Sequence, residues 1–200
     1  TLLPEELLHI QTTAEALRAM KEFLADNAEM APALAAYASQ MQQFSRLEKQ
    51  ISSAIDEHAE IKDNASPKLN GLRTAIQISK NRVKDKLDSI LHDPNNQKYF
   101  MDNIVTMRGD RYVIPIKQEY KMNFPGIVHD QSGTGATLFI EPLAVVNLNN
   151  DIKRYVAEEK EEMERILRQL TQNVGQEAAA LLATLEIFTK IDVICARALL

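Results

Sequence analysis

One stretch of β-type sequence, residues 103–142, lies between two long helical patterns and limits how the chain can fold. It contains four short runs of β-branched and aromatic residues, and the gaps between them carry turn residues. Glycine in such a gap favours a tight turn because it readily adopts a positive φ. The expected turns are Gly109-Asp110, Pro125-Gly126 and Ser132–Gly135. Four short strands bury little core, so neighbouring helices must support this small sheet.

Helical periodicity accounts for most of the remaining sequence, with apolar residues three or four positions apart. Ser45 and Glu48 have the spacing of a capping box at the start of a helix. Ser66-Pro67 combines an N-cap hydroxyl with a first-turn proline, and Gly175 is the first expected break after the β stretch. We predict helices at residues 5–26, within 27–40, at 45–55, at 67–92, at 97–102, at 143–174 and at 176–200.

The two longest helical patterns flank one small insertion, so we expect these helices to lie side by side and antiparallel. The predicted fold class is mainly α with a small antiparallel β insertion: a helical base, a two-helix arm and a β-tip. The chain begins at Thr1 rather than Met and ends inside a helical pattern. Both ends therefore indicate a piece cut from a longer protein.

Composition narrows the class of protein. The chain has 200 residues, of which 45% are hydrophobic and 26% charged, so it is long and apolar enough to bury a hydrophobic core. No apolar run approaches the roughly 20 residues that a membrane-spanning helix needs. Cys195 is the only cysteine, which excludes an internal disulfide and fits the reducing cytoplasm. The net charge of -5 argues against a uniformly basic nucleic-acid-binding surface, so any such surface must be local.

Two local groups of basic residues are candidates for phosphate contact. The first, Lys80, Arg82 and Lys84, lies on the predicted helix 67–92. It could instead form exposed ion pairs with the acidic run Glu158–Glu162, and we favour that pairing because charge runs are usually solvated faces. Basic residues interleaved with aromatic ones suit nucleic-acid contact. The second group has this setting, although nearby acids nearly balance it: Arg108, Arg111, Lys117 and Lys121 against Asp102, Asp110, Glu119 and Asp130.

The sequence offers no convergent acid, base and nucleophile. In a strand, Asp130 and Ser132 point away from His129, so these three residues cannot form a hydrolytic triad. The glycine-rich loop at Ser132 lacks the Gly-Lys-Ser/Thr ending of a phosphate-binding loop, and no Walker-type motif occurs elsewhere. The four histidines are scattered without metal-ligand spacing. We predict no catalytic, cofactor-binding or metal-binding residue in this chain.

Three segments, residues 108–120, 125–142 and 144–167, resemble the MutS-related ATPases of bacteria, and best match their second paralogue, the MutS-two family. The string from Gly126 to Pro142, GIVHDQSGTGATLFIEP, is the most specific part, and residues 60–91 are similar to the family's helix before its clamp. The resemblance implies a helical core part at residues 1–66, an outgoing lever helix at 67–92, a clamp-like β insertion at 93–142, a returning lever helix at 143–174 and a core helix at 175–200.

The same resemblance implies that the ATPase domain, which would bind ATP and Mg, and a nuclease-like Smr domain belong to other parts of the full-length protein. The family is associated with recombination suppression, branched DNA and the rescue of collided ribosomes. The resemblance therefore implies a cytoplasmic, homodimeric full-length protein whose partner is DNA or ribosomal RNA. We predict a non-catalytic lever and clamp region that binds such a partner. The alternative is a structural coiled-coil module that associates with itself or another protein through Leu69, Ile76 and Val83.

Overall fold

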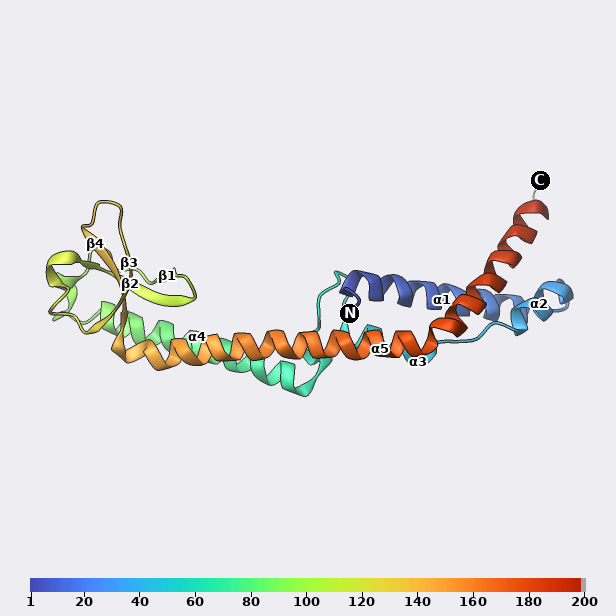
Figure 1. Cartoon of the computed structure of the whole chain (residues 1–200), viewed down its shortest axis with the longest axis horizontal. Coiled ribbons are helices and arrows are strands. Elements are labelled where there is room, and N and C mark those ends of the chain that lie inside the picture. The colour runs from blue at the N-terminus through green and yellow to red at the C-terminus, as the bar shows by residue number, and fades with distance from the viewer. Residues whose placement is uncertain (199–200) are drawn as a thin grey trace. The chain divides into compact units, whose positions relative to one another are not determined.

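The computed structural model describes residues 1–198, which form two compact units. Unit 1 comprises residues 1–69 and the chain from Glu162 onward, and unit 2 comprises residues 70–161. Most of the described residues are helical, and the strands form one four-stranded antiparallel sheet (Figure 1). The predicted fold class, mainly α with a small antiparallel β insertion, is confirmed.

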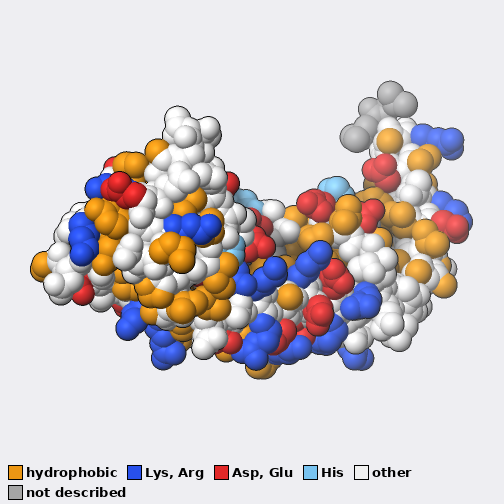
Figure 2. All heavy atoms as spheres, turned by 60° about the vertical axis from the view of Figure 1, so that its left-hand side comes forward, with side chains coloured by type: hydrophobic (Ala, Val, Ile, Leu, Met, Phe, Trp, Pro, Cys, Tyr) orange, Lys and Arg blue, Asp and Glu red, His pale blue; other side chains and the backbone are white. Residues whose placement is uncertain are grey.

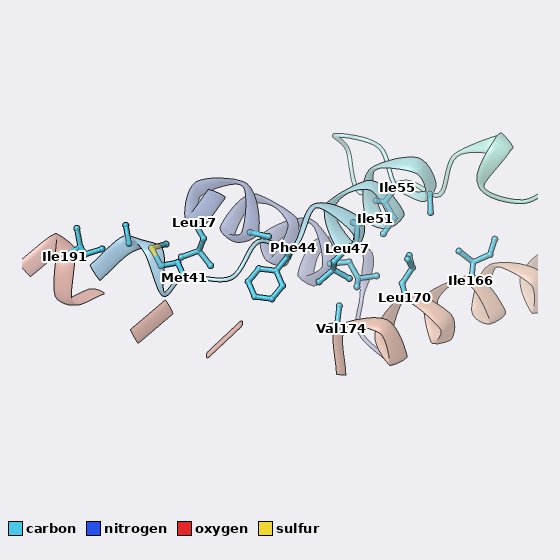
Figure 3. Packing of buried hydrophobic residues seen from close by; sticks show 14 of the residues in the cluster. Leu17, Met41, Phe44, Leu47, Ile51, Ile55, Ile166, Leu170, Val174 and Ile191 are labelled. Atoms are coloured by element: carbon cyan, nitrogen blue, oxygen red, sulfur yellow. The ribbon is translucent and has the colours of Figure 1, made fainter. Parts of the chain in front are cut away.

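Unit 1 is built from helices whose apolar faces meet in one core. Leu17, Ile51 and Leu170 are almost wholly buried and lie on three different helices, which contribute side chains to the same cluster (Figure 3). This shared burial supplies the main stabilisation of the unit. Its elements are α1 (Pro4–Asp26), α2 (Pro32–Ser39), α3 (Ser45–Ala54), a 3-10 turn (Asp63–Ala65) and the part of α5 (Val146–Ala198) that follows residue 161.

Helix α3 begins at the predicted residue but without the predicted cap. Phe44 occupies the N-cap position and makes no side-chain capping bond with any described residue. The buried carboxylate of Glu48 instead accepts a hydrogen bond from Arg18 Nε of α1 at 3.1 Å. The capping-box prediction was wrong because Glu48 faces α1, where a charged donor offers a stronger bond than a backbone N–H.

Helix α5 runs without interruption from Val146 to Ala198, so the predicted break at Gly175 was wrong. A single glycine costs a helix only about 1 kcal/mol relative to alanine. Val174 and Ile191, on either side of it, are both buried in the core of unit 1, and this burial favours a continuous helix. Residues 199 and 200 of the predicted last helix lie outside the described residues.

Unit 2 contains the sheet and the helices that support it. The strands are β1 (Thr106–Arg108), β2 (Arg111–Lys117), β3 (Gly126–Gln131) and β4 (Thr137–Pro142), in the order β1-β2-β4-β3. The unit also holds α4 (Pro67–Leu91) from residue 70, the start of α5 and 3-10 turns at Gln97–Tyr99, Gln118–Tyr120 and Leu143–Val145. Gly109 and Gly135 have φ values of 56° and 78°, as the turns predicted there require. The turn predicted at Pro125-Gly126 was wrong, because Gly126 begins β3 and the turn lies at residues 121–123.

Two predicted helix limits in this unit were wrong. The short helix expected at residues 97–102 is reduced to a 3-10 turn over its first three residues. The helix expected from residue 143 begins at Val146. Pro142 remains in β4, where it pairs with Gly126, and the 3-10 turn Leu143–Val145 separates the strand from the helix.

The core of unit 2 lies between one face of the sheet and the two helices. Tyr112, Ile114 and Ile116 alternate along β2 and all face this core. Leu91, at the end of α4, and Val145, just before α5, are buried in the same cluster. Further along, Arg73 Nε of α4 lies 2.8 Å from Glu159 Oε1 of α5. The two helices therefore lie side by side and antiparallel within this unit, as predicted.

The predicted N-cap of α4 is confirmed and extends into a buried polar cluster of unit 1. Ser66 Oγ accepts a hydrogen bond from Leu69 N–H at 3.0 Å and donates one to Glu162 Oε1 at 2.7 Å. Arg165 donates to both oxygens of the same carboxylate, at 2.7 and 3.0 Å. These bonds from Arg165, followed by that from Ser66, hold the pKa of Glu162 at about 2, although burial acts in the opposite direction.

Replacing Glu162 with Gln should lower the free energy of unfolding by about 1–3 kcal/mol, because Arg165 and Ser66 lose a charged partner at a buried site. The folded-state pKa lies below the ordinary value of 4.5, so this contribution is present above that pH and is lost as the pH falls towards 2. Urea unfolding at neutral and acid pH measures it. Glu161→Gln, at an exposed neighbouring position, is the control; equal stability of the two variants would contradict the assignment.

Gly126 should not tolerate a side chain, because a Cβ atom there would lie 2.6 Å from the Glu141 backbone oxygen. We expect Gly126→Ala to destabilise the protein by about 1–3 kcal/mol through overpacking between β3 and β4. Gly133→Ala is the matched control, since nothing lies within 4 Å of its Cβ position. Thermal unfolding of both variants checks this prediction. An unchanged melting temperature for Gly126→Ala would show that β3 and β4 can move apart at little energetic cost.

Candidate nucleic-acid interface

The sheet has an outer face that carries three of the predicted basic residues. Tyr112 and Ile114 of β2 face the core, so Arg111 and Lys117 point to the opposite side. Arg108 of β1 lies directly opposite Arg111 in the strand register and therefore shares that side. We call this side the outer face of the sheet.

The outer face is organised around Glu141 of β4, whose carboxylate is almost wholly buried. Asn149 Nδ2 of α5 and Arg111 Nη1 of β2 donate to its Oε1 at 2.7 and 3.2 Å. On β3, His129 Nε2 lies 2.6 Å from its Oε2. A buried carboxylate without donors is strongly unfavourable. The three donors satisfy this charge, and each comes from a different element.

Asn149 also completes the hydrogen bonding of β2. In the register of β2 with β4, Ile114 pairs with Ile140. Two positions further along, this register would set Tyr112 opposite Pro142, which has no N–H to donate. The Asn149 side-chain amide takes this place: Oδ1 accepts from Tyr112 N–H at 3.3 Å, and Nδ2 donates to the Tyr112 carbonyl at 3.2 Å. The start of α5 is thereby bonded to the sheet.

Arg108 and Arg111, two of the predicted phosphate-binding residues, are already engaged by carboxylates. Arg108 Nε lies 3.0 Å from Asp130 Oδ2, and its guanidinium carbon lies 3.6 Å from the centre of the Phe139 ring. Arg111 pairs with Glu141. A phosphate would have to replace a charge-assisted hydrogen bond at either residue. Both arginines therefore stabilise the sheet, and sequence spacing gave no sign of this because their partners lie on other strands.

The two predicted lysines of this region have no acidic partner. Lys117 Nζ lies 3.4 Å from the backbone carbonyl oxygen of Lys98, and Lys121 is exposed beside the 3-10 turn Gln118–Tyr120. Within residues 1–198, neither ammonium group has a carboxylate oxygen within 4.0 Å. Their charges are therefore open to an external anion.

A third lysine, Lys98, joins them and was not predicted from the sequence. Its ammonium lies 5.0 Å from the centre of the Tyr99 ring, which in turn packs edge-on against Tyr120 with ring centres 5.3 Å apart. An isolated bridge between Phe100 and Ile116 holds this segment beside β2, which brings together residues about 20 positions apart. We call Lys98, Lys117 and Lys121 the tip lysines.

On α4, the predicted ion pairs of Lys80, Arg82 and Lys84 do not form. Among the described residues, none of the three has a carboxylate oxygen within 4.0 Å. The acidic run is paired otherwise: Glu158 with Arg154, Glu159 with Arg73, and Glu162 with Lys68 and Arg165. The pairing prediction was wrong because Arg73 lies against Glu159. In an antiparallel pair, Lys80 then lies about two turns beyond the acidic run.

The residues considered for a hydrolytic triad have separate partners. His129 contacts Glu141, and Asp130 pairs with Arg108. Ser132 Oγ accepts a hydrogen bond from Thr137 N–H at 3.1 Å within the turn between β3 and β4. In the part of the chain that the structure describes, no group of three His, Cys, Asp or Glu side chains is placed to hold a metal ion.

Charge on the visible surface is mixed rather than uniformly basic. Figure 2 shows Lys and Arg side chains separated by hydrophobic and acidic ones, without one continuous basic face. Such a surface favours contacts by a few exposed cations over attraction by a broad field. Among the predicted basic residues of unit 2, those without carboxylate partners in the described part of the chain lie at two places, the tip lysines and the basic residues of α4.

Comparisons with known proteins agree on one family. The chain is 45% identical over 201 residues to "Endonuclease MutS2" of Geobacillus sp. (strain WCH70), with 99% of this chain and 26% of that protein covered. It is 44% identical over 201 residues to the protein of the same name from Bacillus cytotoxicus, with the same shares covered. The Symbiobacterium thermophilum protein of that name is 45% identical over 189 residues, covering 94% of this chain and 24% of that protein.

No protein-family model matches the chain. No helix among the described residues is both long and apolar enough to span a bilayer. The chain spans about a quarter of the length of the curated relatives that it matches. Identity at this level over nearly the whole chain confirms the resemblance found in the sequence, and the chain belongs to the MutS2 family.

Proposed function

We propose that this chain is a non-catalytic, nucleic-acid-binding region of a MutS2-type ATPase. Unit 2 provides a clamp-like sheet supported by α4 and the start of α5, which serve as the lever helices. Binding of ATP and Mg, and any cleavage of nucleic acid, belongs to other parts of the full-length cytoplasmic protein. The relatives' name, endonuclease, agrees with a nucleic acid as partner.

The observation that carries the proposal is the division among the basic residues of the sheet. Arg108 and Arg111 are bound by carboxylates, whereas the tip lysines are free of acidic partners within the described residues. Unpaired lysines at the surface attract phosphates and release the counterions around them, without reading base sequence. The exposed Arg82 and Lys84 on α4 offer a second contact of the same kind.

This chemistry suits both partners that the family resemblance implies. Branched DNA and ribosomal RNA present the same phosphate groups, so the tip lysines alone do not distinguish them. We also propose that the five parts expected from the sequence, with their limits near residues 66, 92, 142 and 174, correspond to core, lever, clamp, lever and core.

The double variant Lys117→Glu, Lys121→Glu should weaken binding to branched DNA about tenfold or more at low salt. It should also lower the salt dependence, by about 0.9 in the log-log slope for each lost phosphate contact. Fluorescence anisotropy across a salt series measures both quantities. The control is Lys49→Glu, Lys190→Glu, which makes the same charge change at exposed positions of unit 1.

Equal affinity of the two double variants would contradict phosphate binding at the tip. The same titration with ribosomal RNA separates the two partners, since the preferred one should bind more tightly at physiological salt. No measurable binding of the unaltered chain at low salt would defeat the proposal as a whole.

A second candidate function, association with a copy of itself or another protein, is supported by an apolar groove in unit 1. The groove has a volume of about 340 Å³ and lies between α1 and α5. Ile10, Val174 and Leu181 line it, and Leu182, which also lines it, is 63% exposed. An exposed apolar groove of this kind marks a site where another surface can dock.

The residues first expected to mediate such association are not available for it. Leu69, Ile76 and Val83 are buried within the chain itself, so the expectation that they pair between chains was wrong. Leu69 packs into the core of unit 1, and Val83 packs into the core of unit 2. Self-association would therefore use the groove between α1 and α5.

Light scattering at high protein concentration tests this second function. If it holds, the unaltered chain should be dimeric, and Leu182→Glu should make it monomeric because a charge enters the apolar groove. Leu143→Glu, at a similarly exposed leucine of unit 2, is the control and should remain dimeric. A monomeric unaltered chain would remove this reading.

A further inference from the structure

We propose that Met122 is an apolar wedge that inserts between adjacent bases of a duplex whose phosphates are held by the tip lysines. This inference rests on the proposed nucleic-acid binding and adds a contact to the bases. Met122 is 91% exposed, the highest value among the large hydrophobic side chains of the described residues. A single exposed apolar side chain is common on protein surfaces, so what distinguishes Met122 is the fixed turn that carries it and the lysines around it.

The turn that carries Met122 is held firmly on both sides. The Tyr120 carbonyl accepts hydrogen bonds from Asn123 N–H at 2.9 Å and from Phe124 N–H at 3.2 Å. Phe124 is buried and packs edge-on against Phe100, with ring centres 6.0 Å apart. Tyr120 packs in the same way against Tyr99, at 5.3 Å. Tyr120 and Phe124, two positions to either side of Met122, are therefore anchored in the core of unit 2, while residues 121–123 between them are exposed.

An anchored, protruding apolar side chain is what a wedge between bases requires. Proteins that kink duplexes insert Met, Leu, Ile, Phe or Pro between base steps and partly unstack them. A freely moving loop would lose more conformational freedom on insertion than this short turn does. Methionine is unbranched and polarizable, so it can enter a narrow opening and pack against base faces.

The charged surroundings of Met122 favour nucleic acid over an apolar partner. Lys121 precedes it in the chain, and Lys98 adjoins Tyr99, which packs against Tyr120, with Lys117 Nζ 3.4 Å from the Lys98 carbonyl oxygen. The exposed acids Asp102 and Glu119 lie on the same segments and would repel phosphates. Three cations against two acids give only weak attraction, so a contact with the bases would add affinity that charge does not supply.

Base unstacking can be measured directly with duplexes that contain 2-aminopurine, whose fluorescence rises when stacking is lost. We expect the 200-residue chain to raise this fluorescence and Met122→Ala to reduce the rise and weaken binding by about fivefold or more. Met122→Leu should largely restore both. The matched control is Met30→Ala, at a methionine of unit 1 that is 86% exposed. A DNA duplex and an RNA duplex, each carrying the probe, distinguish the two sources of stacked bases.

The outcomes separate the wedge from phosphate binding. If Lys117→Glu, Lys121→Glu weakens binding while Met122→Ala leaves the fluorescence rise unchanged, phosphate binding stands and the wedge is excluded. If the lysine variant has no effect, the proposed function fails first, and the wedge fails with it. If Met122→Ala abolishes binding to a protein partner while leaving both duplex signals intact, Met122 serves protein recognition instead.

Discussion

The buried carboxylate of Glu141 is the constraint on which the sheet of unit 2 depends. Four short strands bury too little apolar area to fix their own arrangement. Glu141 requires donors, and Arg111, His129 and Asn149 supply them from β2, β3 and α5. Withdrawing any one of these elements would leave a buried charge underpaired, which is far more costly than the loss of an exposed ion pair. The network therefore fixes one arrangement of strands and helix.

The same network determines which basic residues remain available to a partner. Arg111 is drawn into the sheet by Glu141, and Arg108 is held by Asp130 and Phe139. The tip lysines have no carboxylate partner within 4.0 Å among the described residues. Arginine suits the first role because its planar guanidinium binds carboxylates and aromatic faces, whereas lysine presents a compact charge that remains hydrated. In unit 2, the two arginines are thus paired with carboxylates, while the tip lysines remain without acidic partners among the described residues.

The parts of the fold that the sequence predicted correctly depend on local signals. Residues a few positions apart are enough to predict the hairpin at Gly109, the cap at Ser66 and the buried apolar face of α4. Two of the errors share another cause: Glu48 bonds to a different helix, and the partners of Lys80 depended on the register of two helices. Periodicity gives the face of a helix but not its exact neighbour.

Most of the basic residues of the candidate site could be predicted from the sequence, but which of them pair with carboxylates could not. Arg108, Arg111, Lys117 and Lys121 were found as basic residues among aromatic ones, yet their sequence positions do not distinguish paired from unpaired charges. Lys98 was not predicted, because it comes close to Lys117 only through the bridge between Phe100 and Ile116. A β-bulge between Val128 and Asp130 alters the alternation of side chains beside His129, and such irregularities leave little trace in sequence.

A chain with a net charge of -5 cannot rely on long-range attraction to a polyanion. At physiological ionic strength, charges more than about 8 Å apart are largely screened, so under the proposal only cations close to a phosphate, such as the tip lysines, would hold it. The proposed contact would then be short-range, and any added interaction would come from residues near the tip lysines. An exposed apolar side chain held between anchored aromatic residues meets that requirement, because its contribution does not weaken as salt screens the lysines.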